Sequence, residues 1–169
     1  LILYHSTTGQ SAALITLAGG VLIAPFLILS ALGGELADKY DKAWMARTLK
    51  LAEIPFAAIA ALGFILHSIP VLFLALAMFG VMAALFGPIK YGILPDHLAT
   101  RELPAGNALV EGATFLAILT GTIAGGLAAA EKDAGGLIAV LVLGMAVLSL
   151  VSARAVPATG AAAPEISIT

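Results

Sequence analysis

Cysteine is absent from the 169 residues, which excludes disulfide bonds and thiolate metal sites within them. Charge is also scarce: charged side chains make up only 11% of the chain, whereas an ordinary soluble domain carries roughly a quarter. The net charge of −2 gives no reason to expect a nucleic-acid partner. With 61% hydrophobic residues, the chain cannot cover a water-facing surface with polar groups. Its solvent is therefore expected to be lipid.

Sequence motifs of enzymes are missing as well. The three histidines lie near the ends of apolar runs or between them, and none begins an H-E-x-x-H pair. His97 is followed by Glu102, where the H-x-x-x-x-D motif of glycerolipid acyltransferases has aspartate. The chain has no G-x-S-x-G, no phosphate-binding loop and no G-x-G-x-x-G. We therefore predict no catalytic residues, no metal site and no cofactor, and we do not expect an enzyme.

What the chain does have is long apolar runs. A helix that crosses a bilayer needs about 20 largely apolar residues. Five runs satisfy this requirement, at 11–34, 49–66, 71–89, 104–130 and 134–153. Residues 1–5 read as the last turns of an earlier span, so we expect six spans in a chain cut from a longer protein. Residues 1–154 then form a helical membrane bundle, and 155–169, rich in Ala, Pro, Gly and Thr, a flexible cytoplasmic linker.

The distribution of Lys and Arg predicts the orientation of the bundle. Alternation of the spans puts seven basic residues on one side, and only Lys132 on the other. The seven are Lys39, Lys42, Arg47, Lys50, Lys90, Arg101 and Arg154. Because loops rich in Lys and Arg remain in the cytoplasm, this side is predicted to be cytoplasmic.

The apolar run at 104–130 contains an acidic residue, Glu111, about two turns from its start. An ionised carboxylate inside a membrane usually faces a cavity or a partner. A stripe at helical spacing supports an inward face: Asn107, Glu111, Thr114, Ile118, Gly121 and Gly125. Gly121 and Gly125 also form a small-xxx-small pair that allows another helix to approach closely. The alternative is that Asn107 and Glu111 only cap or brace the end of the bundle.

A second acid, Glu53, is expected to matter less. It stands near the start of the 49–66 run, one turn from the preceding polar segment, so its carboxylate can reach the interface. We predict a structural role for it.

The polar segment between the first two complete spans resembles a loop of the major facilitator superfamily. It reads Gly33-Gly34-Glu35-Leu36-Ala37-Asp38-Lys39-Tyr40-Asp41-Lys42, against the family pattern G-x-L-x-D-[RK]-x-G-[RK]-[RK]. The resemblance implies that Asp38, Lys39 and Lys42 help to latch the two halves of a transporter together, with Gly34 allowing close helix contact. Asp41 departs from the pattern, because the family has glycine there.

A second stretch resembles the lysophospholipid transporter branch of that superfamily. It comprises Phe86-Gly87-Pro88-Ile89-Lys90-Tyr91-Gly92-Ile93-Leu94-Pro95, then Glu102-Leu103 and Gly106-Asn107-Ala108-Leu109-Val110-Glu111. The resemblance covers almost the whole chain. It implies the six-helix N-terminal half of a twelve-helix transporter in the bacterial inner membrane, with its first helix truncated. Two features of proton-coupled drug antiporters, an arginine in the fourth helix and a proline beside Gly121 to Gly126, are missing.

Several functions follow from these readings. The leading one is alternating-access transport of lysophospholipid, with Asn107, Glu111, Lys90 and Thr114 on the substrate pathway. Its partners would be membrane lipid, the C-terminal half of the transporter and, as in some members of the branch, an acyltransferase or acyl-carrier-protein synthetase domain. The alternatives are an exporter of small amphipathic molecules, the membrane anchor of a lipid-acylating enzyme, or a partial gene product without activity.

Overall fold

The computed structural model describes residues 8–131, 134–158 and 160–165. Its regular elements are six helices, and no strand occurs among the described residues. They are α2 (Thr8–Lys39), α3 (Lys42–Ile65), α4 (Ile69–Gly92), the single-turn α5 (Leu94–His97), α6 (Leu103–Ala130) and α7 (Ala134–Arg154). All but α5 are long and apolar enough to cross a membrane. The prediction of an all-α, multi-pass membrane protein is therefore confirmed.

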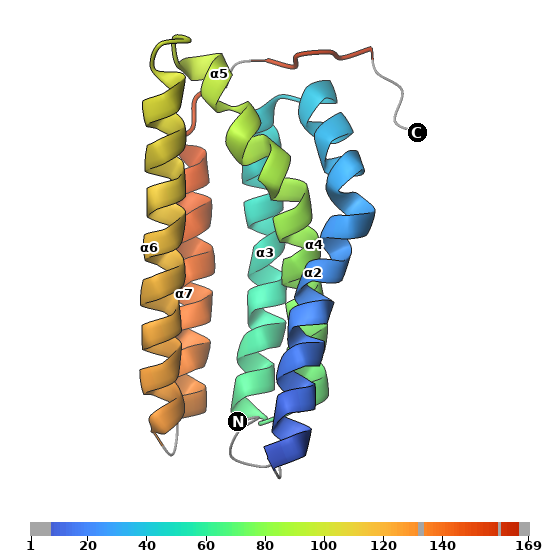
Figure 1. The fold of residues 1–169 in the computed structure, drawn as a ribbon, viewed down its shortest axis with the longest axis vertical. Coiled ribbons are helices and arrows are strands. Elements are labelled where there is room, and N and C mark those ends of the chain that lie inside the picture. Colours follow the sequence, from blue (N-terminus) through green and yellow to red (C-terminus); the bar gives the residue numbers. More distant parts are fainter. Residues whose placement is uncertain (1–7, 132–133, 159, 166–169) are drawn as a thin grey trace.

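The long helices run alternately up and down, so the end of one helix and the start of the next lie at the same end of the bundle (Figure 1). The end of α2, the start of α3, the end of α4, α5, the start of α6 and the end of α7 all lie there. We call it the α5 end. The seven basic residues predicted to share one side of the membrane belong to segments in the half of the bundle nearer this end.

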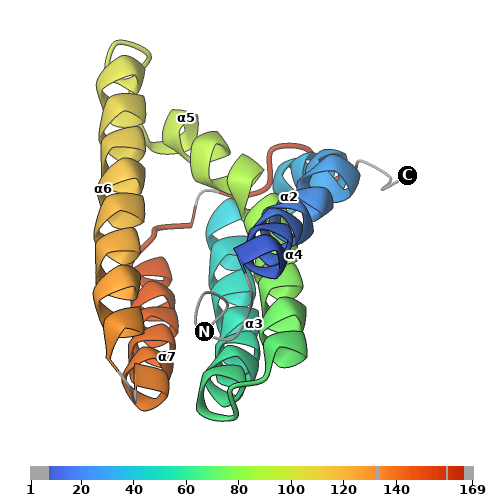
Figure 2. The same cartoon turned by 60° about the horizontal axis from the view of Figure 1, so that its bottom comes forward.

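Helix α4 packs closely against both α2 and α3 (Figure 2). Helices α2 and α3 hardly touch each other. Glycines make this approach possible. A β-carbon on Gly80 of α4 would lie 2.7 Å from the carbonyl oxygen of Leu22 in α2. A β-carbon on Gly33 of α2 would meet the carbonyl oxygen of Ala84 at 3.0 Å. Because such distances exclude a side chain, the α2–α4 contact is one of backbone against backbone.

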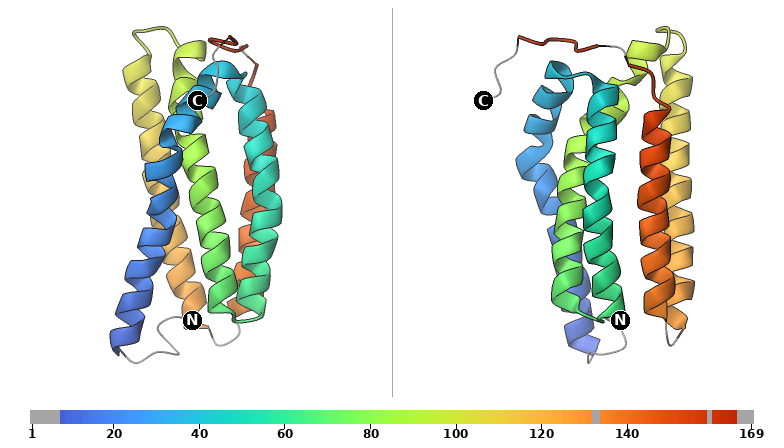
Figure 3. Two further views of the ribbon diagram at one scale, coloured as in Figure 1. Left: turned by 90° about the vertical axis from the view of Figure 1, so that its right-hand side faces the viewer. Right: turned by 180° about the vertical axis from the view of Figure 1, so that it is seen from behind.

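The second close contact joins α3 to α7. Gly135, at the start of α7, faces the carbonyl oxygen of Phe64, which would lie 2.7 Å from an added β-carbon. In contrast, α6 meets α7 and α5 at few points. Figure 3 shows that α6 and α7 are close where they are joined and diverge toward the α5 end. The packed part of the bundle is therefore α2, α3, α4 and α7, with α6 loosely attached.

The segment predicted to be a loop, 33–42, is mostly helical, so this part of the prediction is wrong. Helix α2 continues to Lys39, and α3 begins at Lys42, which leaves only Tyr40 and Asp41 between them. The Oδ1 atom of Asp41 accepts a hydrogen bond of 2.7 Å from the backbone N–H of Trp44, so Asp41 caps α3. Charged residues were interpreted as a loop, but here they lie on the last turn of one helix and the first turn of the next.

The early start of α3 also corrects the position expected for Glu53. Glu53 is the twelfth of the 24 residues of α3, at the middle of the helix and not one turn from its start. Its side chain is 12% exposed.

Two further predicted segments lie at the chain ends. The stub expected at 1–5 lies outside the described residues. Of the predicted linker, 155–158 and 160–165 are described, and they contain no helix or strand. Figure 3 shows this segment leaving α7 and running across the α5 end of the bundle. Its flexibility stays a prediction.

Candidate functional site

A cluster of polar side chains joins α4 to α6 near the α5 end. Lys90 is the third residue from the end of α4, and its ammonium donates a hydrogen bond of 3.3 Å to the hydroxyl of Thr114 in α6. The Lys90 ammonium also lies 4.5 Å from the ring centroid of Tyr91. The Tyr91 hydroxyl in turn donates to the carboxylate of Glu111. Three of the residues predicted for the substrate pathway, Lys90, Glu111 and Thr114, therefore belong to one connected cluster.

Tyr91 was missed by the sequence reasoning, although it lies between Lys90 and Gly92 in the motif that carries the family resemblance. A signal was available: a tyrosine beside the only lysine of an apolar run can bridge an acid on the neighbouring helix. Asn107, one helical turn before Glu111, is exposed, and no hydrogen bond joins its side chain to the described residues. The structure therefore places Asn107 on the same helix as the cluster but not within it.

The cluster contains a cation on α4 and an anion on α6, both in contact with Tyr91. The Lys90 ammonium makes one hydrogen bond within the described residues and the Glu111 carboxylate accepts one, so both have capacity left for a ligand. Both side chains are partly buried, which strengthens any charge-assisted hydrogen bond that a ligand makes there. A zwitterionic group could meet the two charges at once.

One residue of the predicted latch, Lys42, forms an ion pair inside the bundle. Lys42 is buried, 5% exposed, and its ammonium lies 2.9 Å from Oδ2 of Asp96 in α5. Gly92 leaves room for the Lys42 stem, since an added β-carbon there would lie 3.1 Å from its Cε. The Lys42 charge is thus met within the bundle, and this ion pair fastens α5 to the start of α3.

Asp38 and Lys39 lie at the surface of the α5 end. Asp38 is exposed, and its carboxylate makes no hydrogen bond to the described residues. The Lys39 ammonium lies 5.9 Å from the ring centroid of its neighbour Tyr40. At Gly34, no described atom lies within 4 Å of an added β-carbon. The roles of these residues as a latch stay a prediction.

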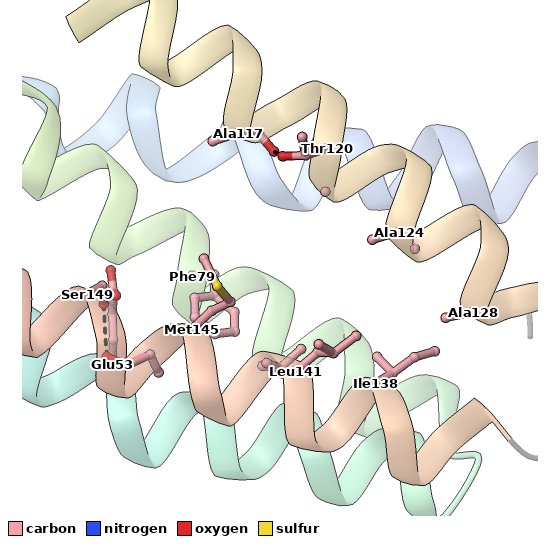
Figure 4. Close-up of a pocket in the computed structure, with 14 residues that line it drawn as sticks. Glu53, Phe79, Ala117, Thr120, Ala124, Ala128, Ile138, Leu141, Met145 and Ser149 are labelled. Atoms are coloured by element: carbon pink, nitrogen blue, oxygen red, sulfur yellow. Dashed lines mark hydrogen bonds between the residues drawn. The ribbon is translucent and has the colours of Figure 1, made fainter.

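Lower in the bundle, an apolar groove of about 670 Å³ opens between α6, α7 and α4 (Figure 4). On α6 its wall is made of small residues and one threonine: Ala117, Thr120, Gly121, Ala124, Gly125 and Ala128. This wall spans eleven residue steps, about 16 Å of helix. Gly121 and Gly125 line the groove as the predicted stripe requires, but no described atom lies within 4 Å of an added β-carbon at either. Close helix approach there stays a prediction.

Glu53 lies at one end of this groove, near Ser149 of α7 (Figure 4). Its carboxylate is 2.7 Å from the Lys50 ammonium, which also lies 4.3 Å from the ring centroid of Phe86. Both charged side chains are largely buried. The ion pair itself lies within α3, and the contact of the Lys50 ammonium with the Phe86 ring joins α3 to α4.

Comparison with known proteins finds similarity to part of several proteins that are named as transporters. It is 38% identical over 110 residues to the lysophospholipid transporter LplT of Pectobacterium carotovorum, a match covering 63% of this chain and 25% of that protein. It is 35% identical over 156 residues to LplT of Serratia proteamaculans, covering 87% of this chain and 35% of that protein. The LplT protein of Yersinia enterocolitica is 36% identical over 110 residues, with coverages of 63% and 25%. Over the aligned residues, the chain is therefore similar to proteins named as lysophospholipid transporters.

The chain spans between about a quarter and about a third of the length of these LplT proteins. No family model matches the sequence. No solved structure matches it either. The LplT relatives are named as transporters and not as enzymes, which agrees with the lack of enzyme motifs in the sequence.

Proposed function

We propose that the chain is part of a lysophospholipid transporter of the bacterial inner membrane, and that the whole protein works by alternating access. The observation that carries the proposal is the sequence similarity to one LplT protein over 87% of this chain, together with five helices able to cross a membrane. The cation–anion cluster between α4 and α6 supplies the chemistry that such a substrate needs. The chain alone, without the rest of the transporter, is not expected to transport.

The finer fold belongs to the same proposal: a six-helix N-terminal half of a twelve-helix major facilitator. The arrangement of α4 supports it. Helices α2 and α3 hardly touch each other, and α4 holds them together by lying against both. Helices α6 and α7 also touch little, and between them the groove is apolar and lined on α6 by small residues. A sixth helix, preceding α2 in the chain, would fill this groove as α4 fills the space between α2 and α3.

In the proposed mechanism the polar cluster receives the headgroup. The phosphate of a lysophospholipid would accept hydrogen bonds from the Lys90 ammonium, and an ethanolamine ammonium would lie against the Glu111 carboxylate. Thr114 holds Lys90 by its 3.3 Å hydrogen bond, and Tyr91 holds Glu111. Asn107, one turn farther toward the α5 end, would line the entrance. The single acyl chain would remain in lipid while the headgroup crosses.

The orientation of the bundle and its latch complete the proposal. The α5 end is the cytoplasmic end, because the predicted excess of Lys and Arg lies there. Exposed Asp38 and half-buried Lys39, with Gly34 one helical turn before Asp38, would face the other half of the transporter at this end. Asp38 could then interact with the positive end of a helix in that half.

Competition separates this cargo from the nearest rival, an exporter of small amphipathic molecules. The full-length gene product would be reconstituted in liposomes that carry labelled lysophosphatidylethanolamine. We expect unlabelled lysophosphatidylethanolamine to inhibit movement of the label, and unrelated hydrophobic cations at equal concentration to leave it unchanged. Inhibition by the cations would favour the exporter. Reading the gene beyond Thr169 tests the third alternative, because acyltransferase motifs directly after this bundle, in place of six more spans, would indicate an enzyme anchor.

A further inference from the structure

The segment that follows α7 makes specific contacts with the junction of α2 and α3. Three hydrogen bonds join them. A guanidinium nitrogen of Arg47 donates to the carbonyl oxygen of Val156 at 2.6 Å, and the N–H of Gly160 donates to Oδ2 of Asp41 at 2.7 Å. The N–H of Ala163 donates to the carbonyl oxygen of Asp38 at 2.8 Å. We call residues 156–158 and 160–163 the strap.

Asp41 is the anchor of this arrangement. One carboxylate oxygen accepts from Trp44 and caps α3, and the other accepts from Gly160 of the strap. Hydrogen bonds to a carboxylate are about twice as strong as those between neutral groups. Asp41 is also the residue that departs from the family pattern, in which glycine stands at this position and could bind no strap.

Two further observations fit a docked strap. Gly160 has φ +86°, a left-handed conformation that glycine adopts without strain and other residues rarely adopt. The carbonyl oxygen of Val156 accepts from one terminal nitrogen of the partly buried Arg47 guanidinium, while its Nε has no hydrogen-bond partner among the described residues. Because a hydrogen bond to a charged group is stronger than one between neutral groups, this contact stabilises the docked strap.

We propose that the strap is a conformational lock on the α2–α3 junction, anchored by Asp41, docked in one state of the transporter and released in another. Figures 1 and 3 show its path from the end of α7 across the α5 end to the end of α2. It therefore ties together helices from opposite sides of the bundle at the end where the predicted latch lies. Three hydrogen bonds hold it to the α2–α3 junction, and none of them joins two of the packed helices, so release requires no rearrangement of those helices. The lock's role in transport rests on the function proposed above.

Disulfide trapping in the full-length gene product, after any cysteines elsewhere have been removed, tests whether the strap docks and whether its docking blocks transport. The hydrogen bond between Ala163 and Asp38 brings their α-carbons within the range that a disulfide spans. The pair Asp38→Cys and Ala163→Cys should therefore cross-link under mild oxidation. The pair Asp38→Cys and Glu131→Cys, at opposite ends of the bundle, should not. Adding Gly160→Ala should slow cross-linking of the first pair about tenfold, because alanine is strained in the left-handed region.

Transport by the cross-linked protein is then compared with transport after reduction. We expect loss of transport in the oxidised form and recovery on reduction. Failure to cross-link, or cross-linking at an unchanged rate with Gly160→Ala, would overturn the docked strap. Cross-linking that leaves transport unchanged would overturn the lock while keeping the docked segment. Should the wild-type protein, with Asp38 in place, move no lysophospholipid, the proposed function fails, and the cross-linking rates still decide whether the strap docks.

Discussion

Replacing Glu111 by glutamine in the full-length gene product should lower the rate of lysophosphatidylethanolamine transport by roughly 10- to 100-fold. The estimate is the loss of one hydrogen bond to a charged group, about 1.5–3 kcal/mol, expressed as a rate. Glutamine keeps the size of the side chain and can still accept from Tyr91, so the cluster in α4 and α6 should keep its shape. The measurement is the initial rate in liposomes at equal amounts of protein.

Two further variants serve as comparisons for Glu111→Gln. Glu131→Gln makes the same chemical change at an exposed position at the opposite end of α6, and should transport at the wild-type rate. Tyr91→Phe removes the hydroxyl that holds Glu111 and should lower the rate less than Glu111→Gln does. Wild-type transport by Glu111→Gln would show that this carboxylate only braces the bundle, the alternative left open by the sequence.

Replacing Gly80 by alanine should destabilise the bundle by about 1–3 kcal/mol, the usual cost of overfilling a packed interface. The added methyl group would lie 2.7 Å from the Leu22 carbonyl oxygen and 3.1 Å from Cγ of Pro25. The first neighbour is backbone, so α2 and α4 must move apart as whole helices. The free energy of unfolding in mixed micelles with increasing dodecyl sulfate measures the effect.

Gly112→Ala is the control for this substitution. Gly112 is also in the middle of a membrane-spanning helix, α6, but no described atom lies within 4 Å of an added β-carbon. Alanine is the better helix former, so this variant should be as stable as the wild type or slightly more stable. Equal destabilisation by the two variants would contradict the close α2–α4 contact.

The number and order of the long helices could be predicted, because each is an apolar run of the required length. The helix ends near charged residues could not. Lys42 and Arg47 interrupt the apolar residues at 42–48, which therefore read as part of a polar loop. Helix α3 nevertheless begins at Lys42, because Asp41 caps it and Asp96 pairs with Lys42. Asp96 is 54 residues away in the chain, and nothing in the sequence indicates that the two charges meet. The central position of Glu53 in α3 follows directly from this extension.

Only part of the candidate site could be predicted from the sequence. Helical spacing placed Glu111 and Thr114 on one face of α6, and the motif around Lys90 drew attention to α4. That these residues form one cluster depends on the distance between α4 and α6, which no spacing within one helix can supply. Tyr91 completes the cluster, and it was missed because its partner Glu111 is on another helix. The strap was missed because its partners are more than 100 residues apart.

The measurement that tests the proposed function most directly is an albumin-extraction assay of the full-length gene product in liposomes. Labelled lysophosphatidylethanolamine is placed in the outer leaflet, and the fraction that albumin can remove is followed over time. Lysophospholipid transport predicts a protein-dependent loss of extractable label, faster than in empty liposomes and in liposomes with heat-inactivated protein. An extractable fraction that stays the same in all three preparations would contradict the proposed function.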